Sequence, residues 1–405
     1  MAKYNYDKSA LKGLGVGAFL NETKVRKAHI DAGKAEMPQS IFNPNVIAAK
    51  LHPSYQMVKV KEIIEREDAK TYVLEPDVEK GTKELAYFRA GQYITIEQEF
   101  DSHYFCKPYT LSSAPKDALG PDNNTYELTI KRSPNGMVSN HILDTWTVGT
   151  GFACSGPLGH FYYQRLRDAA SIIALAGGSG ITPFISMARA IADGTEDFNL
   201  TIIYGSKKAD GILFKKELDE CIAKSNGKVK VIHVLSDDNA EGFEHGFITA
   251  DLIKKYAPDD YTIYVCGSKG MYAYLEKELA KLELPIRKIR FEVPGEYGDP
   301  TADAEYPADK AGKTYKLRVW IHGEYTDITC AAETSLLQSM ELAGIRVTSD
   351  CRSGKCGWCH SRLINGEIYI AKHQDSRREG DIKFNWIHPC CSYPVSDIEL
   401  EVFPL

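Results

Sequence analysis

The pattern of hydrophobic and polar residues changes along the chain, and each pattern predicts a different kind of fold. After Met57, short segments rich in valine, isoleucine and tyrosine alternate with turn residues, which is typical of an antiparallel β-barrel or sandwich. The predicted strands begin at 58–64 and continue at 72–74, 93–96, 109–111, 126–131 and 151–155. The first 53 residues show no sustained period, so we expect an N-terminal extension with a helix near 22–35.

From Ser171 onward the apolar runs become continuous and alternate with helical stretches. We predict strands at 171–176, 200–204, 229–235 and 261–266, and helices at 183–192, 214–224, 249–256 and 271–282. Strands that alternate with helices form a parallel sheet covered on both faces, which explains the lack of polar interruptions. This part is therefore predicted to be an α/β domain.

The last third begins with a segment rich in glycine and proline, 294–313, which we interpret as a linker. A flexible linker of this length spans roughly 20–25 Å, so the module after it could be docked or could swing. That module opens with a hairpin, 315–321 and 324–329, turning at His322–Gly323, and a helix at 334–343 capped by Thr334 or Ser335. The predicted parts are 1–53 (extension), 54–167 (barrel), 168–293 (α/β), 294–313 (linker) and 314–405 (C-terminal domain).

Composition narrows the classes of protein that remain. The chain has 405 residues, 43% hydrophobic and 26% charged, which excludes a fibrous or wholly disordered protein. The net charge is −6 and the sequence has no basic stripe, so we expect no nucleic-acid partner. No segment reads as a membrane span or a signal peptide, and we expect a cytoplasmic protein. Its ten cysteines then need a role other than disulfides.

Four cysteines have the spacing Cys351-x4-Cys356-x2-Cys359-x30-Cys390, which is the arrangement of plant-type [2Fe–2S] sites. Gly354 permits the tight loop that such a site needs. Structural zinc is the less favoured alternative, since zinc sites pair their cysteines in two close knuckles. The segment 315–405 resembles the plant-type ferredoxin domain, including its Cys390-Cys391-Ser392-Tyr393-Pro394 tail. The resemblance implies an α+β (β-grasp) fold and makes Cys390, rather than Cys391, the fourth ligand.

A second motif, Lys107-Pro108-Tyr109-Thr110-Leu111-Ser112, resembles the flavin motif Arg-x-Tyr-Ser/Thr of the ferredoxin–NAD(P)+ reductase superfamily. The resemblance implies that Tyr109 packs on the isoalloxazine and that Thr110 hydrogen-bonds near flavin N5. Lysine at position 107 replaces the family's arginine at the diphosphate, and it offers a point charge without a bidentate fork.

A short segment further along resembles the second flavin element of that superfamily. The resemblance implies a site for the flavin diphosphate, and a helix N-terminus with small residues suits such an anion. A diphosphate site favours FAD over FMN. The residues concerned are Lys131, Gly136, Met137, Val138 and Ser139.

A glycine-rich turn ends an apolar strand and opens a helix at Gly177-Gly178-Ser179-Gly180-Ile181-Thr182-Pro183. Such a turn brings backbone amides to a diphosphate, with Thr182 expected as N-cap and Pro183 as the first helical residue. It resembles the nicotinamide-nucleotide turn of the same superfamily. So does Tyr264-Val265-Cys266-Gly267, where the resemblance implies that Cys266 positions the nicotinamide and is not a nucleophile.

The choice of coenzyme depends on charges near the ribose. Lys207 and Lys208 could receive the 2′-phosphate of NADPH, whereas Asp237 and Asp238 would repel it. The acidic pair leads us to favour NADH over NADPH.

The order of the three modules resembles the phthalate dioxygenase reductase type of iron–sulfur flavoprotein over residues 55–405. The resemblance implies an oxidoreductase in which a hydride passes from NADH to FAD, and single electrons then pass through the [2Fe–2S] cluster to an external redox protein. Tyr109, Thr110 and Cys266 would serve the hydride step. The acceptor could be an oxygenase component, a hydroxylase, an anaerobic reductase or a corrinoid protein. The alternative is a non-autonomous electron-transfer subunit of a larger complex, anchored by residues 1–50.

Overall fold

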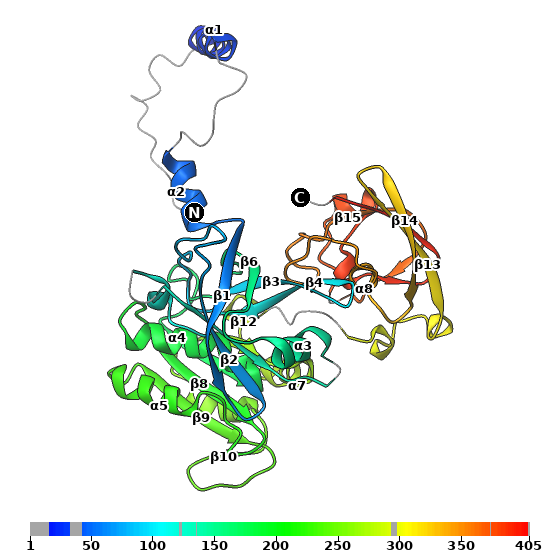
Figure 1. Cartoon of the computed structure of the whole chain (residues 1–405). Coiled ribbons are helices and arrows are strands. Elements are labelled where there is room, and N and C mark those ends of the chain that lie inside the picture. The colour runs from blue at the N-terminus through cyan, green and yellow to red at the C-terminus, as the bar shows by residue number, and fades with distance from the viewer. Residues whose placement is uncertain are drawn as a thin grey trace. The chain divides into compact units, whose positions relative to one another are not determined.

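The computed structural model describes residues 16–32, 43–120, 124–134, 136–292, 298–372 and 374–403. The chain divides into two compact units, 1–50 and 51–405 (Figure 1). Helices α1 (Val16–Ala32) and α2 (Asn43–Leu51) occupy the N-terminal part. The helix predicted at 22–35 therefore begins earlier, at Val16, and its predicted last residues lie outside the described ranges. Within these ranges, no helix combines the length and the apolar character that crossing a membrane requires.

The flavin-type domain is a curled antiparallel sheet, as predicted. Its strand order is β4-β3-β6-β1-β2-β5, and an isolated bridge between Leu111 and Leu128 connects the end of β4 with β5 at the opposite edge. Alternate residues of β1, such as Val58 and Val60, point into the core, as the period of two requires. Its elements are β1 (Tyr55–Glu65), β2 (Ala69–Pro76), β3 (Tyr93–Phe100), β4 (His103–Thr110), β5 (Tyr126–Lys131), α3 (Met137–Thr145) and β6 (Gly151–Ser155).

Strand β4 is longer than the sequence pattern predicted. We expected a strand only at 109–111, but it runs from His103 to Thr110 and pairs with β3 as a hairpin. Pro108 in its middle argues against a central strand, because proline cannot donate to a ladder. The strand tolerates Pro108 because β4 is the edge of the sheet.

The next domain is a six-stranded parallel sheet with the order β10-β9-β8-β7-β11-β12. Side chains of β7 alternate between two cores: Ile172 and Ala174 pack with α4 and α5, and Ile173 with α6 and α7. The sheet is therefore covered on both faces, as predicted. Its elements are β7 (Ser171–Gly177), α4 (Thr182–Ala192), β8 (Asn199–Ser206), α5 (Lys215–Lys224), β9 (Val229–Leu235), β10 (Glu244–His245), α6 (Ala250–Tyr256), β11 (Thr262–Cys266), α7 (Lys269–Ala280) and β12 (Ile289–Phe291).

The C-terminal domain has a five-stranded mixed sheet, β14-β13-β19-β15-β17, and a small second sheet of β16 and β18. The predicted hairpin turn is confirmed: His322 and Gly323 both have positive φ, at 51° and 84°, as a two-residue turn requires. Ser335, not Thr334, caps the helix by accepting from Gln338 N. The elements are β13 (Thr314–Ile321), β14 (Glu324–Ala331), α8 (Leu336–Leu342), β15 (Ser361–Asn365), β16 (Ile368–Tyr369), α9 (Glu379–Lys383), β17 (Trp386–Ile387), β18 (Tyr393–Pro394) and β19 (Ile398–Val402).

The described part of the linker, from Gly298 onward, packs on the C-terminal domain instead of forming a free tether. Tyr306 is buried edge-on against the ring of Tyr369, with 5.1 Å between ring centroids. Tyr393 donates a hydrogen bond of 3.0 Å to the carbonyl of Gly298. These linker residues thus pack on the domain that follows them, a contact that their glycine- and proline-rich pattern did not indicate. The domain boundaries given above remain predictions.

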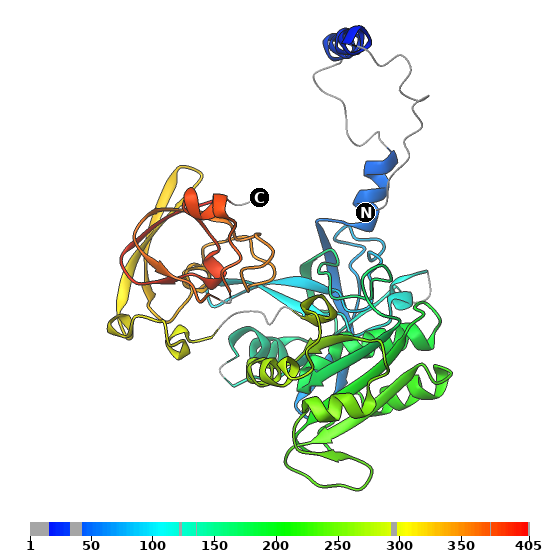
Figure 2. The same cartoon turned by 180° about the vertical axis from the view of Figure 1, so that it is seen from behind.

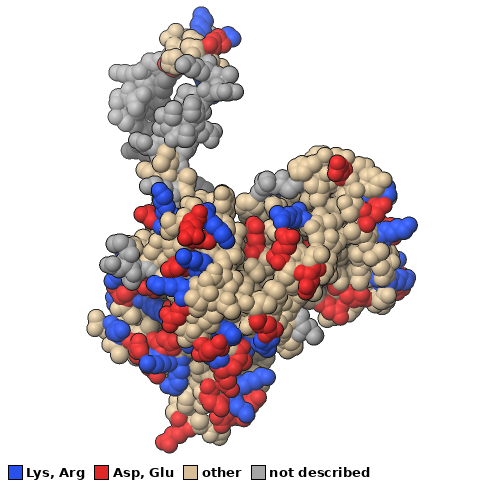
Figure 3. Space-filling view, viewed as in Figure 1, with Lys and Arg blue, Asp and Glu red and all other residues tan. Residues whose placement is uncertain are grey.

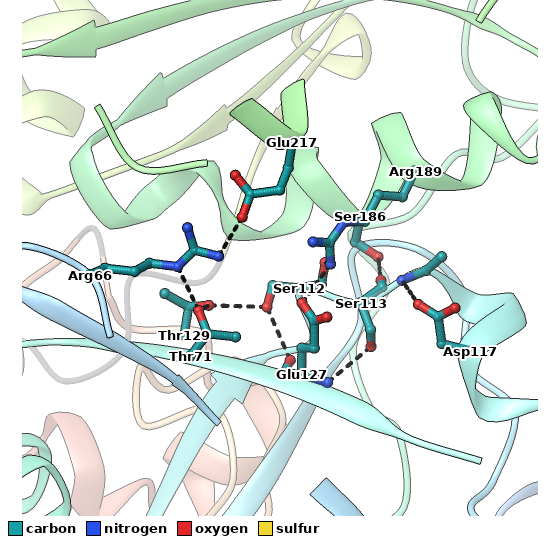
Figure 4. A network of polar contacts seen from close by, with 11 residues as sticks. Arg66, Thr71, Ser112, Ser113, Asp117, Glu127, Thr129, Ser186, Arg189 and Glu217 are labelled. Carbon is teal, nitrogen blue, oxygen red and sulfur yellow. Dashed lines mark hydrogen bonds and ion pairs between the residues drawn. The ribbon is translucent and has the colours of Figure 1, made fainter. Parts of the chain in front are cut away.

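Polar side chains join the flavin-type barrel to the α/β domain (Figure 4). Arg189 of α4 forms an ion pair of 2.5 Å with Glu127 of β5 and donates to the carbonyl of Ser112. Arg66, just after β1, pairs with Glu217 of α5 at 2.6 Å. Hydrogen bonds between charged groups are stronger than neutral ones, and guanidinium groups also fix orientation. These contacts hold the two domains in a defined relation.

Gly91 of the barrel lies close to the Phe161 backbone and to Met187 of α4, and this close approach leads to a stability prediction. Its φ is +104°, and a Cβ there would overlap the Phe161 carbonyl and lie 2.8 Å from Met187 Cε. We expect Gly91→Ala to lower the thermal midpoint by at least about 2 °C more than Gly194→Ala does. Gly194 also has positive φ but has nothing within 4 Å of that position. Equal midpoints for the two variants would contradict the close approach.

Candidate functional site

A cavity of about 1070 Å³ opens where the three domains of residues 51–405 meet. The wall combines residues of the flavin-type barrel, the glycine-rich turn of the α/β domain, and Cys351 of the C-terminal domain. A cavity of this size exceeds what an ordinary small ligand needs and suits dinucleotides. One space is thus shared by segments that are far apart in the sequence.

The predicted flavin residues divide between the cavity wall and the barrel core. Tyr109, Thr110, Lys131 and Ser139 line the cavity. Burial raises the pKa of Tyr109 and keeps its phenol neutral, as an apolar ring support requires.

The remaining predicted flavin residues are not among those that line the cavity. Leu111 and Ser112 are fully buried, and Ser112 Oγ donates to the Glu127 carbonyl. Val138 packs in the core and Met137 is exposed, while Lys107 lies on β4 with its Nζ 5.8 Å from the Phe105 ring centroid.

Helix α3 presents an uncapped N-terminus beside this wall. Gly136 is the N-cap residue, and no side chain caps the first turn. Ser139 Oγ would lie 2.5 Å from a Cβ at Gly136, so only glycine leaves this turn open. Free N–H groups and the helix dipole favour an anion here, which fits the predicted diphosphate position.

The glycine-rich turn approaches Cys266 more closely than any side chain would allow. A Cβ at Gly180 would overlap the Cys266 carbonyl and lie 2.7 Å from Gly267 N. Gly177 and Gly267 likewise face the thioether of Met271, a cavity residue that the sequence reasoning missed. Backbone therefore forms this part of the wall, as binding of a nucleotide diphosphate requires.

The expected capping role of Thr182 is wrong. A 3-10 turn over Gly178–Ile181 leads directly into α4, so Thr182 is already helical and Ile181 occupies the N-cap position. Thr182 Oγ1 instead donates to the carbonyl of Ser179 at 3.1 Å, and Pro183 follows within the first turn. Gly177, Gly178, Gly180 and Thr182 line the cavity, whereas Pro183 is buried behind it.

Cys266 ends β11 at the cavity wall with Glu292 and Tyr272 beside it. Burial and then the nearby Glu292 carboxylate raise the pKa of the Cys266 thiol. A neutral thiol is a poor nucleophile, so the group can position a ligand without attacking it. Tyr272 donates to the Glu292 carbonyl at 3.2 Å. Glu292 belongs to no motif, and only the fold reveals it.

The cluster loop directs backbone amides at the cysteine sulfurs. Cys351 Sγ accepts from the amides of Lys355 and Cys356, at 3.4 and 3.3 Å, and Cys390 Sγ accepts from Gly354 N at 3.2 Å. Such donors stabilise thiolates. Gly354 and Gly357 have φ of +74° and +80°, which lets the loop turn tightly.

The four predicted ligands form two pairs. A hydrogen bond from Cys356 lowers the pKa of Cys351 to about 6, and one from Cys359 lowers the pKa of Cys390. In each pair the other cysteine, Cys356 or Cys359, has a raised pKa, because it donates a hydrogen bond to its partner's sulfur. Two pairs of cysteines match the two irons of the cluster type that the spacing indicates. The donor set therefore fits a [2Fe–2S] cluster.

Cys391 differs from its neighbour in hydrogen bonding. Its Sγ donates to the His388 carbonyl at 3.4 Å, which requires a protonated thiol, whereas Cys390 Sγ accepts from an amide. Both side chains are buried. This contrast favours Cys390 as the ligand, although the two residues are adjacent.

Comparison with known proteins agrees with this geometry. The family model "Oxidoreductase FAD-binding domain" matches residues 57–163, "Oxidoreductase NAD-binding domain" matches 174–277, and "2Fe-2S iron-sulfur cluster binding domain" matches 320–395. The glycine betaine monooxygenase reductase subunit of Chromohalobacter salexigens is 25% identical over 379 residues, covering 90% of this chain and all of that protein. NADH-cytochrome b5 reductase 1 of Candida glabrata is 30% identical over 205 residues, covering 49% of this chain and 70% of that protein.

Among solved structures, phthalate dioxygenase reductase shares the fold with a TM-score of 0.60 and 24% identity, covering 87% of this chain and 98% of that one. Fold and site together define an oxidoreductase with FAD-binding, NAD-binding and [2Fe–2S] domains. The chain belongs to the ferredoxin–NAD(P)+ reductase superfamily, in the branch with a C-terminal plant-type ferredoxin domain.

The close approach at Gly180 predicts a selective loss of coenzyme binding. Gly180→Ala should lower kcat/KM for the nicotinamide coenzyme by tenfold or more, on the order expected when a turn shifts by about 1 Å. FAD and iron contents should stay at wild-type values. Gly270→Ala should lower kcat/KM much less, because the nearest atom to a Cβ at Gly270 is Ser268 Oγ at 4.0 Å. Similar losses in both variants would show that the approach of Gly180 to Cys266 is unimportant.

The two adjacent cysteines give a second prediction. Cys390→Ser should lose iron or change the visible spectrum of the cluster, because a ligand is replaced. Cys391→Ser should keep two irons and two sulfides per chain. Iron and acid-labile sulfide analysis of the purified variants decides between them, and the reverse result would move the fourth ligand to Cys391.

Proposed function

We propose that the chain is an NADH-dependent reductase that supplies single electrons to a separate redox protein. Bound FAD would accept a hydride, and the [2Fe–2S] cluster would deliver electrons one at a time. The observation that carries the proposal is the shared cavity, where Tyr109 and Thr110, the turn at Gly180, and Cys351 all face one space. In this proposal the barrel residues position FAD and the glycine turn positions NADH.

No acid or base is needed in the proposed hydride step, so the protein contributes by positioning. Cys266, kept neutral by burial, would contact the nicotinamide without reacting. Glu292 and Tyr272 would hold that side of the cavity in place through the hydrogen bond between them. The catalytic roles of Tyr109, Thr110 and Cys266 belong to this proposal.

The relatives favour an oxygenase component as the acceptor. A relative that this chain covers over its whole length is named a reductase subunit of a monooxygenase. The ferredoxin domain leaves Trp358, next to Cys359, 45% exposed, and Ile382 and Phe384 are exposed as well. Acidic and basic side chains are intermixed on the face drawn in Figure 3. Residues 315–405 contain ten Lys and Arg and twelve Asp and Glu, so a partner of this domain would meet a mixed surface rather than a strongly acidic one.

NADH is the coenzyme that the cavity favours. Asp237 lies on the wall after β9, where Ser236 Oγ donates to its carboxylate at 2.6 Å. A carboxylate can accept from a ribose 2′-hydroxyl and repels a 2′-phosphate. Lys207 and Lys208 also line the wall. The Asp237 carboxylate offsets part of the attraction that these two lysines would have for a 2′-phosphate.

Replacing that carboxylate tests the coenzyme proposal. Wild-type protein should have a higher kcat/KM for NADH than for NADPH, and Asp237→Ala should reduce the ratio by about tenfold. Asp238→Ala is the matched control, because it removes the same charge from a residue that is not among those lining the cavity. A ratio that changes equally in both variants would mean that net charge, not position, sets the preference.

The visible spectrum tests the proposed function as a whole. Protein purified without oxygen should contain one FAD, two irons and two sulfides per chain. About 1.5 equivalents of NADH, which supply the three electrons that FAD and cluster accept together, should bleach both chromophores. Bleaching by NADPH alone would overturn the coenzyme assignment. Zinc in place of iron would overturn the assignment of the ferredoxin domain.

Deleting residues 1–50 distinguishes the alternative of a non-autonomous subunit. Those residues form a unit of their own, and the described side chains of α1 are exposed. An independent reductase should keep NADH-dependent dye reduction after the deletion. A non-autonomous subunit should show little dye reduction with the full chain, and the deletion should abolish its complex formation.

A further inference from the structure

The hairpin of β3 and β4 reaches from the barrel to the ferredoxin domain, next to α8 (Figures 1 and 2). Because β4 is an edge strand, its outer backbone groups have no neighbouring strand to pair with. At Cys106, side chains of the ferredoxin domain form hydrogen bonds with these backbone groups. Arg352 Nη1 donates to the Cys106 carbonyl at 3.0 Å, and Cys106 N donates to Glu341 Oε1 at 3.4 Å.

Arg352 and Glu341 also bind each other. Their two parallel hydrogen bonds measure 2.5 and 2.6 Å, and the side chains are 1% and 0% exposed. An ion pair so completely removed from water holds its geometry firmly, because either charge alone would be costly to bury. The pair therefore holds the ferredoxin domain next to Cys106 of the barrel.

Asp350 makes a second buried contact with the same hairpin. Its carboxylate accepts from Thr95 Oγ1 at 2.6 Å and from Tyr93 Oη at 3.0 Å, both on β3. Thr95 is itself held by a hydrogen bond from its amide to Ser155 Oγ at 2.9 Å. These contacts join two domains through a carboxylate that is 6% exposed.

Cys351, the first cluster cysteine, lies between these two contacts in the sequence and lines the cavity with Tyr93. By contrast, the outer pair Arg346–Glu99 has both side chains more than 60% exposed and contributes little. The strong contacts between the domains therefore flank the one cluster residue that faces the cavity.

We propose that Asp350 and Arg352 are positioning residues that clamp the cluster loop to the β3–β4 hairpin, so that electrons reach the cluster in a docked domain and not in a swinging one. The link to electron transfer rests on the proposed function, whereas the clamp itself does not. The clamp acts through hairpin and loop, and neither residue needs to touch a cofactor.

The test uses the full-chain holoprotein with Thr95→Val, since Arg352 variants could fail to fold. This change removes one clamp hydroxyl without changing side-chain size. Thr71→Val is the matched control, because Thr71 is a buried barrel threonine whose hydroxyl bonds Thr129 and Arg66 instead. Hydrogen–deuterium exchange should become about tenfold faster in hairpin and cluster loop for Thr95→Val only.

Rapid mixing with NADH provides the second readout. Flavin bleaching should keep its wild-type rate in Thr95→Val, while the following cluster bleaching slows severalfold. Unchanged exchange would overturn the clamp. Faster exchange with unchanged cluster bleaching would overturn its positioning role. If NADH bleaches neither centre in the wild type, the proposed function fails, and the exchange result alone then decides whether the clamp exists.

Discussion

Arginine–carboxylate pairs lie where the barrel meets the α/β domain and where it meets the ferredoxin domain, and the shared cavity depends on the relation that these pairs fix. Arg189 binds Glu127 between the α/β domain and the barrel, and Arg352 binds Glu341 where the ferredoxin domain meets β4. Arg290 of β12 binds Asp168, and it also bonds carbonyls of the segment that follows the barrel. Each arginine thus donates both to a carboxylate and to backbone across the junction.

The chemistry explains why arginine serves at these places. Its planar group has several donors in a fixed fork, so one side chain can hold a carboxylate and a carbonyl in a defined orientation. Removing one partner of a buried pair costs about 3–5 kcal/mol, so Arg352 and Glu341 keep their places and present a donor to the Cys106 carbonyl across the junction. Apolar contacts alone are not directional and would define the cavity less sharply. One hydrophobic core continues from the α/β domain to Ala90 and Phe161 on the barrel side, and the directional polar contacts add a defined orientation to this apolar packing.

Much of the fold could be predicted because its signals are local. The strands at 229–235, 126–131 and 151–155 match β9, β5 and β6 in both bounds, since alternating or continuous apolar runs end at turn residues. The cysteine spacing and the glycine-rich turn carry their chemistry in a few consecutive residues. The cysteine spacing indicates the ferredoxin domain, and the glycine-rich turn, together with the flavin motif, indicates the reductase superfamily.

The remaining features depend on contacts between distant residues, which leave no local pattern. Strand β4 was underestimated because Pro108 is acceptable only on an edge, and edges are a property of the sheet. Thr182 does not cap its helix, because the preceding 3-10 turn already supplies helical backbone. No sequence motif indicated Asp350 or Glu292, because their roles depend on partners elsewhere in the chain, Thr95 and Tyr272.

The most direct test of the account is the rate at which the cluster is reduced in wild-type holoprotein after mixing with NADH. A docked ferredoxin domain predicts a first-order rate that is the same at all protein concentrations and in buffers of increasing viscosity. A rate that falls in proportion to viscosity would show that the domain must move to receive its electron. A rate that rises with protein concentration would show transfer between chains, and either result would contradict the fixed junctions described above.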